Sequence, residues 1–131
     1  MEGMSAANVV DEETTVGAWR GLLAAHARVH GALERALKPY DLGVSEYEVL
    51  ERLASEEFKE QRRMQELGEA LYLSQSALSR VVGRLEAEGL VTRTICPNDR
   101  RGIFTCLTAE GRKRYEAARP TQRRVLAETL Q

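Results

Sequence analysis

Six polar residues between positions 74 and 84 are spaced so that they share one face of a helix. The apolar residues among them, Leu78, Val81, Val82 and Leu85, follow the pattern of a buried helical stripe. The residues on the opposite face are Ser74, Gln75, Ser76, Ser79, Arg80 and Arg84. Short polar side chains let a helix approach the bases of a DNA major groove, and arginine pairs with guanine or phosphate. The pattern therefore suits DNA contact, although an ordinary helix with a solvated side has it too.

A second set of candidate contacts lies in the turn-forming segment Cys96–Gly102. The flanking residues, 90–95 and 103–107, are rich in β-branched and aromatic types, which predicts a two-stranded hairpin. The charged residues at its tip are Asp99, Arg100 and Arg101. An arginine at the end of a narrow ribbon can reach the DNA backbone or an adjacent minor groove, and the aspartate can hold it extended. A plain solvated turn is the alternative.

The elements that position these residues follow from the hydrophobic period. Apolar residues at intervals of three and four predict a long helix from about Thr15 to Leu37, ended by Pro39. Ser45 and Glu48 have the spacing of a capping box at the start of a second helix.

A third, short helix is predicted over Met64–Leu71. A tight turn then leads to the fourth helix, with Ser74 as its N-cap and Gly89 as its stop. Thr108 caps a last helix after the hairpin, and Pro120 should kink or break that helix. Two helices joined by a short turn and followed by a hairpin form a winged helix-turn-helix, here in a mainly α fold with a small β-hairpin wing.

The charge balance supports a chain with one basic side. The net charge is −1, but residues 1–60 hold 6 Lys and Arg against 12 Asp and Glu, whereas residues 61–131 hold 13 against 8. A basic half joined to an acidic half suits a protein that meets phosphate on one face. No nucleophile–base pair or phosphate-cradling glycine loop is visible, so we expect neither an enzyme nor a cofactor. No run is apolar enough to span a membrane and no secretory pattern is visible, which predicts a cytoplasmic location.

The cysteines and histidines leave alternatives open. Cys96 and Cys106 flank the predicted turn and could face each other across the hairpin, but two reduced thiols packed as small apolar residues are the favoured interpretation. His26 and His30 fall on the inward stripe of the first helix, which favours a packing seam or a dimer interface. Lining a ligand pocket and binding a metal are the alternatives, in that order.

Taken together, these motifs resemble the MarR family of bacterial transcriptional regulators. The resemblance covers nearly the whole chain, and its pieces are specific as a set. They are Trp19–Leu37, Tyr47-Glu48-Val49-Leu50, Leu67–Leu71, Ser74–Val82, Leu85–Arg93, Asn98–Gly102 and Leu107–Gly111.

The resemblance implies a homodimer and a division of the chain. A flexible acidic segment over residues 1–14 is expected before a single domain over 15–131. The DNA-binding lobe covers about 45–108, and the dimerisation helices are about 15–38 and 108–131. The chain ends at Gln131, before the position at which the family's last dimerisation helix is expected to end. This implies either a reduced C-terminal dimer interface or a shortened sequence.

The resemblance also implies a function. Two recognition helices would read a palindromic site in double-stranded DNA, one helical turn apart, and Arg101, steadied by Asp99, would enter the minor groove. Family members usually repress genes and release DNA when a small ligand, often an aromatic anion, or an oxidant binds. The first helix has no cysteine, so oxidant sensing through that helix is not expected. A winged-helix protein-interaction module without DNA binding is the alternative.

The resemblance also implies a ligand pocket between the dimer helices and the DNA-binding lobe. Its candidate residues are Trp19, His26, His30 and Tyr47. For Trp19 a place in the core or the interface is favoured over a stacking platform.

Overall fold

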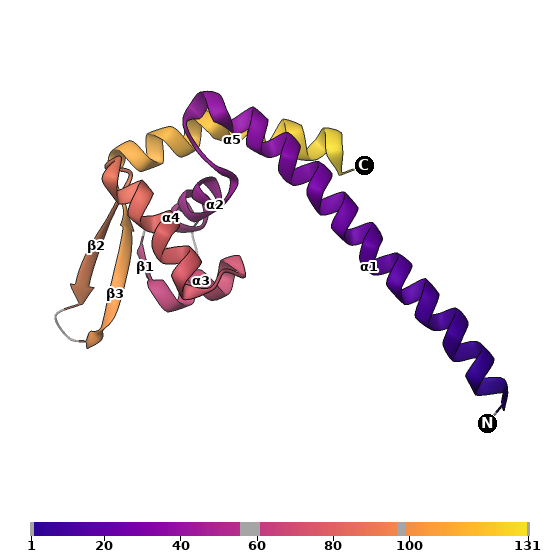
Figure 1. The fold of residues 1–131 in the computed structure, drawn as a ribbon. Helices are drawn as coiled ribbons and strands as arrows, with labels where there is room; N and C mark the ends of the chain where they lie inside the picture. Colours follow the sequence, from indigo (N-terminus) through magenta and orange to yellow (C-terminus); the bar gives the residue numbers. More distant parts are fainter. Residues whose placement is uncertain (1, 56–60, 97–98, 131) are drawn as a thin grey trace.

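The computed structural model describes residues 2–55, 61–96 and 99–130, and residues 2–10, 95–96 and 99–101 through their backbone alone. Helices and a small sheet form a lobe, from which a long helix projects (Figure 1). The elements in chain order are α1 (Glu2–Leu37), η1 (Lys38–Tyr40), α2 (Val44–Ala54), β1 (Gln61–Arg63), α3 (Met64–Leu71), α4 (Gln75–Ala87), β2 (Val91–Cys96), β3 (Asp99–Leu107) and α5 (Ala109–Thr129). The predicted winged helix-turn-helix is confirmed.

The first helix, α1, ends at Leu37 as predicted but begins much earlier than expected. Residues 2–14 are helical, where we expected a flexible acidic segment and a helix start at about Thr15. That prediction relied on the apolar stripe, whose first residue is Trp19. The preceding residues contain alanine, glutamate and methionine and no proline, so the local preference allows the helix to extend through them.

The start of α2 differs from the predicted capping box. Gly43 is the N-cap residue, and its backbone N–H donates to Oε1 of Glu46 at 2.8 Å. Ser45 therefore lies inside the first turn, and Glu48 is not the capping carboxylate. A glycine cap has no side chain to complete the box, so half of the usual sequence signal is missing.

The helix-turn-helix of α3 and α4 has the predicted boundaries. Ser74 is the N-cap of α4, and its Oγ accepts a hydrogen bond from the Ala77 backbone N at 3.2 Å. Tyr72 turns the chain between the helices in a left-handed conformation, with φ 57° and ψ 36°. Gly89 follows α4 with φ 76°, a conformation that glycine adopts at no steric cost.

The hairpin is longer than predicted. β2 and β3 pair antiparallel as far as Cys96 opposite Asp99, so the turn does not extend over the whole of Cys96–Gly102. The backbones of Asp99, Arg100 and Arg101 belong to β3. Pro97 and Asn98, at the predicted tip, lie outside the described residues.

A third strand, β1, completes a sheet with the order β1-β3-β2 among the described residues. Three polar residues gave no alternating pattern by which β1 could be predicted. β1 pairs with β3 so that Cys106 lies opposite Gln61 on one side and opposite Thr92 on the other. The suggestion that Cys96 and Cys106 face each other is therefore wrong, and Cys106 is a free thiol.

The last helix, α5, begins after Thr108, as predicted. The Thr108 Oγ1 accepts a hydrogen bond from the Gly111 backbone N at 3.0 Å. Pro120 lies inside α5 without interrupting it, so the predicted break is wrong. Proline removes one backbone donor there, but Ala118 and Gln122 on either side are buried, and α5 packs against α1 and α2.

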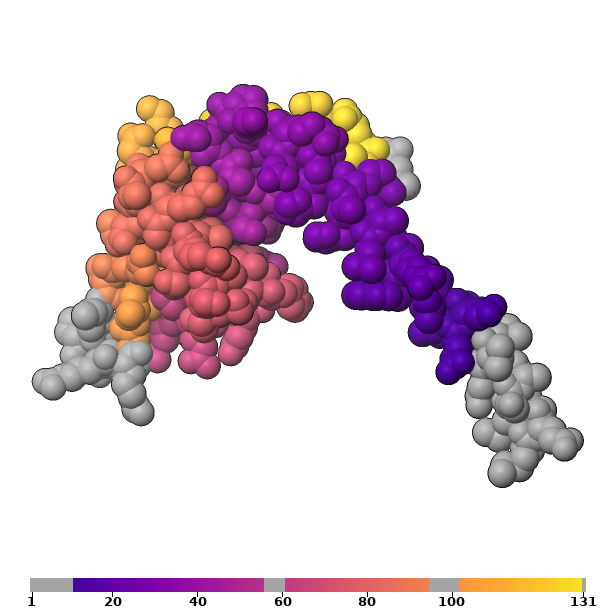
Figure 2. All heavy atoms as spheres, viewed as in Figure 1, coloured from indigo at the N-terminus to yellow at the C-terminus, as the bar shows by residue number. Residues whose placement is uncertain are grey.

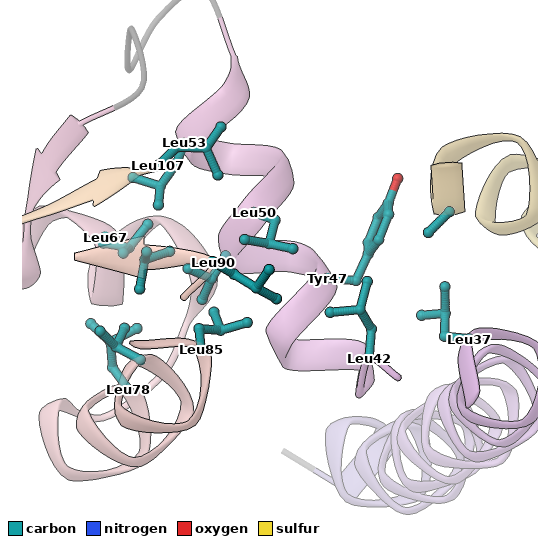
Figure 3. Close-up of a cluster of buried hydrophobic side chains, with 14 residues drawn as sticks. Leu37, Leu42, Tyr47, Leu50, Leu53, Leu67, Leu78, Leu85, Leu90 and Leu107 are labelled. Atoms are coloured by element: carbon teal, nitrogen blue, oxygen red, sulfur yellow. The ribbon is translucent and has the colours of Figure 1, made fainter. Parts of the chain in front are cut away.

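One apolar core connects the lobe to the long helices. In Figure 3, side chains from α2, α3 and α4 and from the sheet converge beside the C-terminal end of α1. The labelled residues are Leu37, Leu42, Tyr47, Leu50, Leu53, Leu67, Leu78, Leu85, Leu90 and Leu107. Ala118 of α5 belongs to the same cluster. Over the described residues, no helix has the length and apolar character needed to cross a membrane.

Candidate nucleic-acid interface

The exposed side of α4 carries the predicted polar face. Leu78, Val82 and Leu85 are fully buried in the core, and Val81 is half-buried. The residues on the other side are all exposed: Ser74, Gln75, Ser76, Ser79, Arg80 and Arg84. The structure thus brings these six residues together along one helix.

Two of these residues also hold the turn in place. Ser74 caps α4 through its hydroxyl, which lies 3.3 Å from the hydroxyl of Ser76. The Gln75 side-chain amide donates to the Met64 carbonyl at 3.5 Å, across the turn in α3. Ser79 and Arg80 have no such internal role among the described residues, so their side chains are the most available on this face.

Arg84 is the residue of this face that contacts a buried acid. Its Nη2 lies 3.8 Å from Oε1 of Glu46, whose side chain is 6% exposed. The same Oε1 accepts the hydrogen bond from Gly43, while Oε2 is buried without a hydrogen-bond partner in the described part of the chain. Glu46 therefore links the start of α2 to α4.

Arg80 differs from its basic neighbours in having no acidic partner among the described residues. Arg93 pairs with Glu86 at 3.3 Å, and Arg62 pairs with Glu66 at 3.3 Å. Such pairs neutralise part of the positive charge of this half of the chain. Arg80 keeps its charge available for an external anion.

The wing residues are placed by their backbone. Asp99, Arg100 and Arg101 were predicted in the turn at the tip of the hairpin, but their backbones form the start of β3. The structure describes only the backbone of these residues. The contact between Asp99 and Arg101 therefore stays a prediction.

The four predicted ligand-pocket residues do not form one site. Tyr47 is fully buried in the core, with its hydroxyl 3.4 Å from Nη1 of Arg123, so it is a packing residue. Trp19 is 58% exposed on the projecting part of α1. His26 is also exposed, and its ring stacks on that of His30 with centroids 5.5 Å apart. In the described part of the chain, no group of three or more His, Cys, Asp or Glu residues is placed to hold a metal.

A cavity of about 440 Å³ lies between α1, the start of α2 and α4. His30 is the predicted pocket residue that lines it. Its charged lining is completed by Glu34, Glu46, Arg80 and Arg84. An adjoining hollow of about 510 Å³ shares three of these side chains. Glu34 and Glu46 were not predictable as site residues from the sequence, because they meet α4 only through the tertiary fold.

Tyr72 was also not predicted as a site residue, although its side chain is 95% exposed beside the start of α4. The sequence signal that could have identified Tyr72 is a bulky aromatic residue in the tight turn before Ser74. Such a turn often needs a left-handed backbone conformation, which favours glycine.

The comparisons with known proteins agree with this geometry. A model of the MarR family matches residues 40–102, which include α2, α3, α4 and most of the wing. No curated protein sequence matches the chain.

Three solved structures are similar over most of their length. AbsC, a MarR family transcriptional regulator from Streptomyces coelicolor, is 33% identical with a TM-score of 0.79, over 88% of this chain and 78% of AbsC. Sco3205 of the same organism, in complex with DNA, is 32% identical with a TM-score of 0.78, over 90% and 73%. CouR from Rhodococcus jostii, bound to p-coumaroyl-CoA, is 28% identical with a TM-score of 0.72, over 82% and 72%. The identity and coverage shared with AbsC and Sco3205, together with the family model, show that the chain belongs to the MarR family of transcriptional regulators.

Proposed function

We propose that the protein is a homodimeric, sequence-specific DNA-binding repressor that a small-molecule ligand releases from DNA. The observation that carries this proposal is the exposed polar face of α4. The opposite, apolar side of α4 packs in the core, and the β2–β3 wing follows the helix. Sco3205, which is similar over most of its length, was solved in complex with DNA. The predicted cytoplasmic location is part of the same proposal.

Base recognition is assigned to α4. A helix of this kind fits the major groove, where the hydroxyls of Ser76 and Ser79 permit close approach. Arg80 supplies a charge for guanine or phosphate. Arg100 and Arg101 of the wing would lie near the adjacent backbone and minor groove.

Dimerisation is assigned to α1. Its projecting half stands clear of the lobe in Figure 2 and carries a set of exposed apolar side chains. These are Val16 (43% exposed), Trp19 (58%), Leu22 (66%) and Leu23 (48%). A contiguous apolar face on one helix marks a protein–protein contact, and a two-fold dimer presents two α4 helices to a palindrome.

Ligand release is assigned to the 440 Å³ cavity. Arg80 and Arg84 reach it from α4, while His30 and Glu34 reach it from α1. A ligand in this cavity would contact both the DNA-binding helix and the dimer helix, and it would favour dimers whose α4 helices are wrongly spaced for DNA. Arg84 is paired with Glu46, so Arg80, which has no acidic partner among the described residues, is the side chain that suits an anion. CouR was solved with p-coumaroyl-CoA bound, which supports a small-molecule effector, here predicted to be an aromatic anion.

Selection of DNA from a random library tests the proposal. The wild-type protein should enrich a palindrome. Arg101→Ala should weaken binding to all sequences, whereas Arg80→Ala should also change which sequences bind. If both variants bind the selected duplex as tightly as the wild type at about 150 mM salt, the assigned DNA face is wrong.

Two further outcomes separate the remaining parts of the proposal. Failure to enrich any sequence would favour a protein-interaction module. Repeating the selection with phenolic carboxylates identifies a ligand that releases the duplex.

A further inference from the structure

Tyr72 combines two features that are each unfavourable for this residue type. Its backbone is in the left-handed region, with φ 57°, where a side chain with a Cβ atom is sterically strained. Its side chain is also 95% exposed, so the ring gains nothing from burial. A glycine at this position would avoid the strain, which makes the tyrosine notable.

The turn itself does not need the tyrosine ring. The backbone N–H of Leu73 donates to the Gly68 carbonyl at 3.0 Å, and the Leu73 side chain packs against the core. The Tyr72 hydroxyl has no hydrogen-bond partner among the described residues. The backbone bonds and Leu73 therefore define the turn, and the ring is left facing solvent.

Asp41 shows the contrast. It is the other non-glycine residue with a positive φ in the described part of the chain, also 57°. Aspartate tolerates this conformation better than a bulky residue does, and Asp41 lies 3.9 Å from Arg114. In the part of the chain that the structure describes, Tyr72 has no comparable hydrogen bond or ion pair to explain its presence.

We propose that Tyr72 contacts DNA at the edge of the groove that α4 enters. Tyr72 lies two residues before Ser74, so its exposed side chain is at the end of α4 that carries Ser74, Gln75 and Ser76. It also borders a hollow lined by Ser45, Glu48 and Arg52 of α2. The ring packs against a deoxyribose, and the hydroxyl donates a hydrogen bond to a phosphate oxygen. Tyrosine is among the side chains that contact phosphate and sugar and thereby fix the register of a protein on the duplex. The inference rests on the proposed DNA-binding function.

This assignment predicts opposite effects on stability and on binding. Tyr72→Gly removes the backbone strain, so the midpoint of thermal unfolding should rise or stay unchanged. The same change should weaken DNA binding by about tenfold, because the packing of the ring and a hydrogen bond to a charged group are both lost. Because tyrosine is uncharged, the dependence of affinity on salt should not change, whereas Arg80→Ala should reduce it.

The experiment measures Kd at several salt concentrations, together with thermal unfolding, on a duplex selected by the wild-type protein. Tyr72→Phe keeps the ring and the backbone conformation and should weaken binding several-fold through loss of the hydroxyl. Asp41→Gly is the matched control for relief of a positive φ, and it should leave Kd unchanged.

The outcomes are distinct. If Tyr72→Gly and Tyr72→Phe bind like the wild type while Arg80→Ala binds weakly, the inference is wrong and the proposed function stands. If the wild type selects no duplex, the proposed function fails and this inference fails with it. Should Tyr72→Gly fold poorly, the Kd of Tyr72→Phe decides.

Discussion

Glu46 connects the start of α2 to α4 through one carboxylate. Its Oε1 accepts the hydrogen bond from the Gly43 N–H at 2.8 Å and lies 3.8 Å from Nη2 of Arg84. The Arg84 side chain is 76% exposed, so the ion pair itself contributes little. The capping hydrogen bond, from a nearly buried acceptor, is the larger contribution.

We therefore expect Glu46→Ala to lower the free energy of unfolding by about 1–2 kcal/mol, since an N-terminal cap is lost. Glu46→Gln keeps an oxygen that can accept from Gly43 and should retain most of the stability. Urea denaturation of the two variants measures the difference. Equal destabilisation by both would mean that the charge, and not the cap, is what matters.

Glu48 provides a prediction about pH. Burial raises the pKa of its carboxyl group, and the neighbouring Glu51 carboxylate raises it further, while Arg52 and Arg123 act in the opposite direction. A carboxyl group whose pKa is higher in the folded state favours folding when it is protonated. That contribution is lost as the pH rises through the folded pKa.

Glu48→Gln should consequently stabilise the protein at pH 7, by about 1–2 °C in the unfolding midpoint if the effect is a few tenths of a kcal/mol. The gain should vanish near pH 3.5, where both side chains are neutral. Thermal unfolding at the two pH values provides the comparison. A lower midpoint at pH 7 would show that the attraction of Arg52 and Arg123 outweighs the cost of burial.

At the scale of elements, Gly111 determines how closely the start of α5 approaches the backbone of Leu90, between α4 and β2. A Cβ atom at this position would clash with the Leu90 backbone carbonyl and would lie 2.8 Å from Cδ1 of Leu107. The Leu90 carbonyl is fixed because it accepts a hydrogen bond from the Thr108 N–H at 3.1 Å. The backbone therefore cannot give way cheaply.

Gly111→Ala should lower the free energy of unfolding by about 2–4 kcal/mol through overpacking. Gly83→Ala in α4 is the matched control, because its Cβ would meet only the flexible end of Arg93, at 3.4 Å. The control should be neutral or slightly stabilising, as alanine favours a helix. Chemical denaturation of both variants tests this, and a neutral Gly111→Ala would show that the helix start can shift.

The elements that were predictable from sequence are those whose signals are local. Leu78, Val82 and Leu85 repeat within one helix, and Ser74 and Thr108 cap the helices that directly follow them. The candidate site on α4 was predictable for the same reason.

Features that depend on distant partners were not predictable. β1 exists because Gln61 pairs with Cys106 in β3, far along the chain. Glu46 became a site residue only when the fold brought it to Arg84. The apolar stripe of α1 did not indicate which of its residues pack against the rest of the protein. Leu33 and Leu37 are buried, whereas Trp19 is exposed.

Across the whole molecule, basic residues and exposed apolar residues are concentrated in different parts of the sequence. The half of the chain with excess positive charge, residues 61–131, contains α4 and the wing, and the acidic half contains α1. The projecting part of α1 has the exposed apolar residues of the proposed dimer contact. The basic excess is therefore shared between the winged helix-turn-helix and α5, which packs against α1.

The proposed dimer contact on α1 leads to the last prediction. Trp19 and Leu23 lie one helical turn apart and are 58% and 48% exposed, and full burial of such a side chain contributes about 1.5–3 kcal/mol. The double variant Trp19→Glu with Leu23→Glu should be monomeric in sedimentation equilibrium. Its affinity for the selected palindrome should fall by about a hundredfold or more, because two linked half-site contacts become independent. Ile103→Glu on β3, where the side chain is 47% exposed, is the control and should remain dimeric. A double variant that stays dimeric would place the interface elsewhere and leave this apolar face of α1 without an assigned partner.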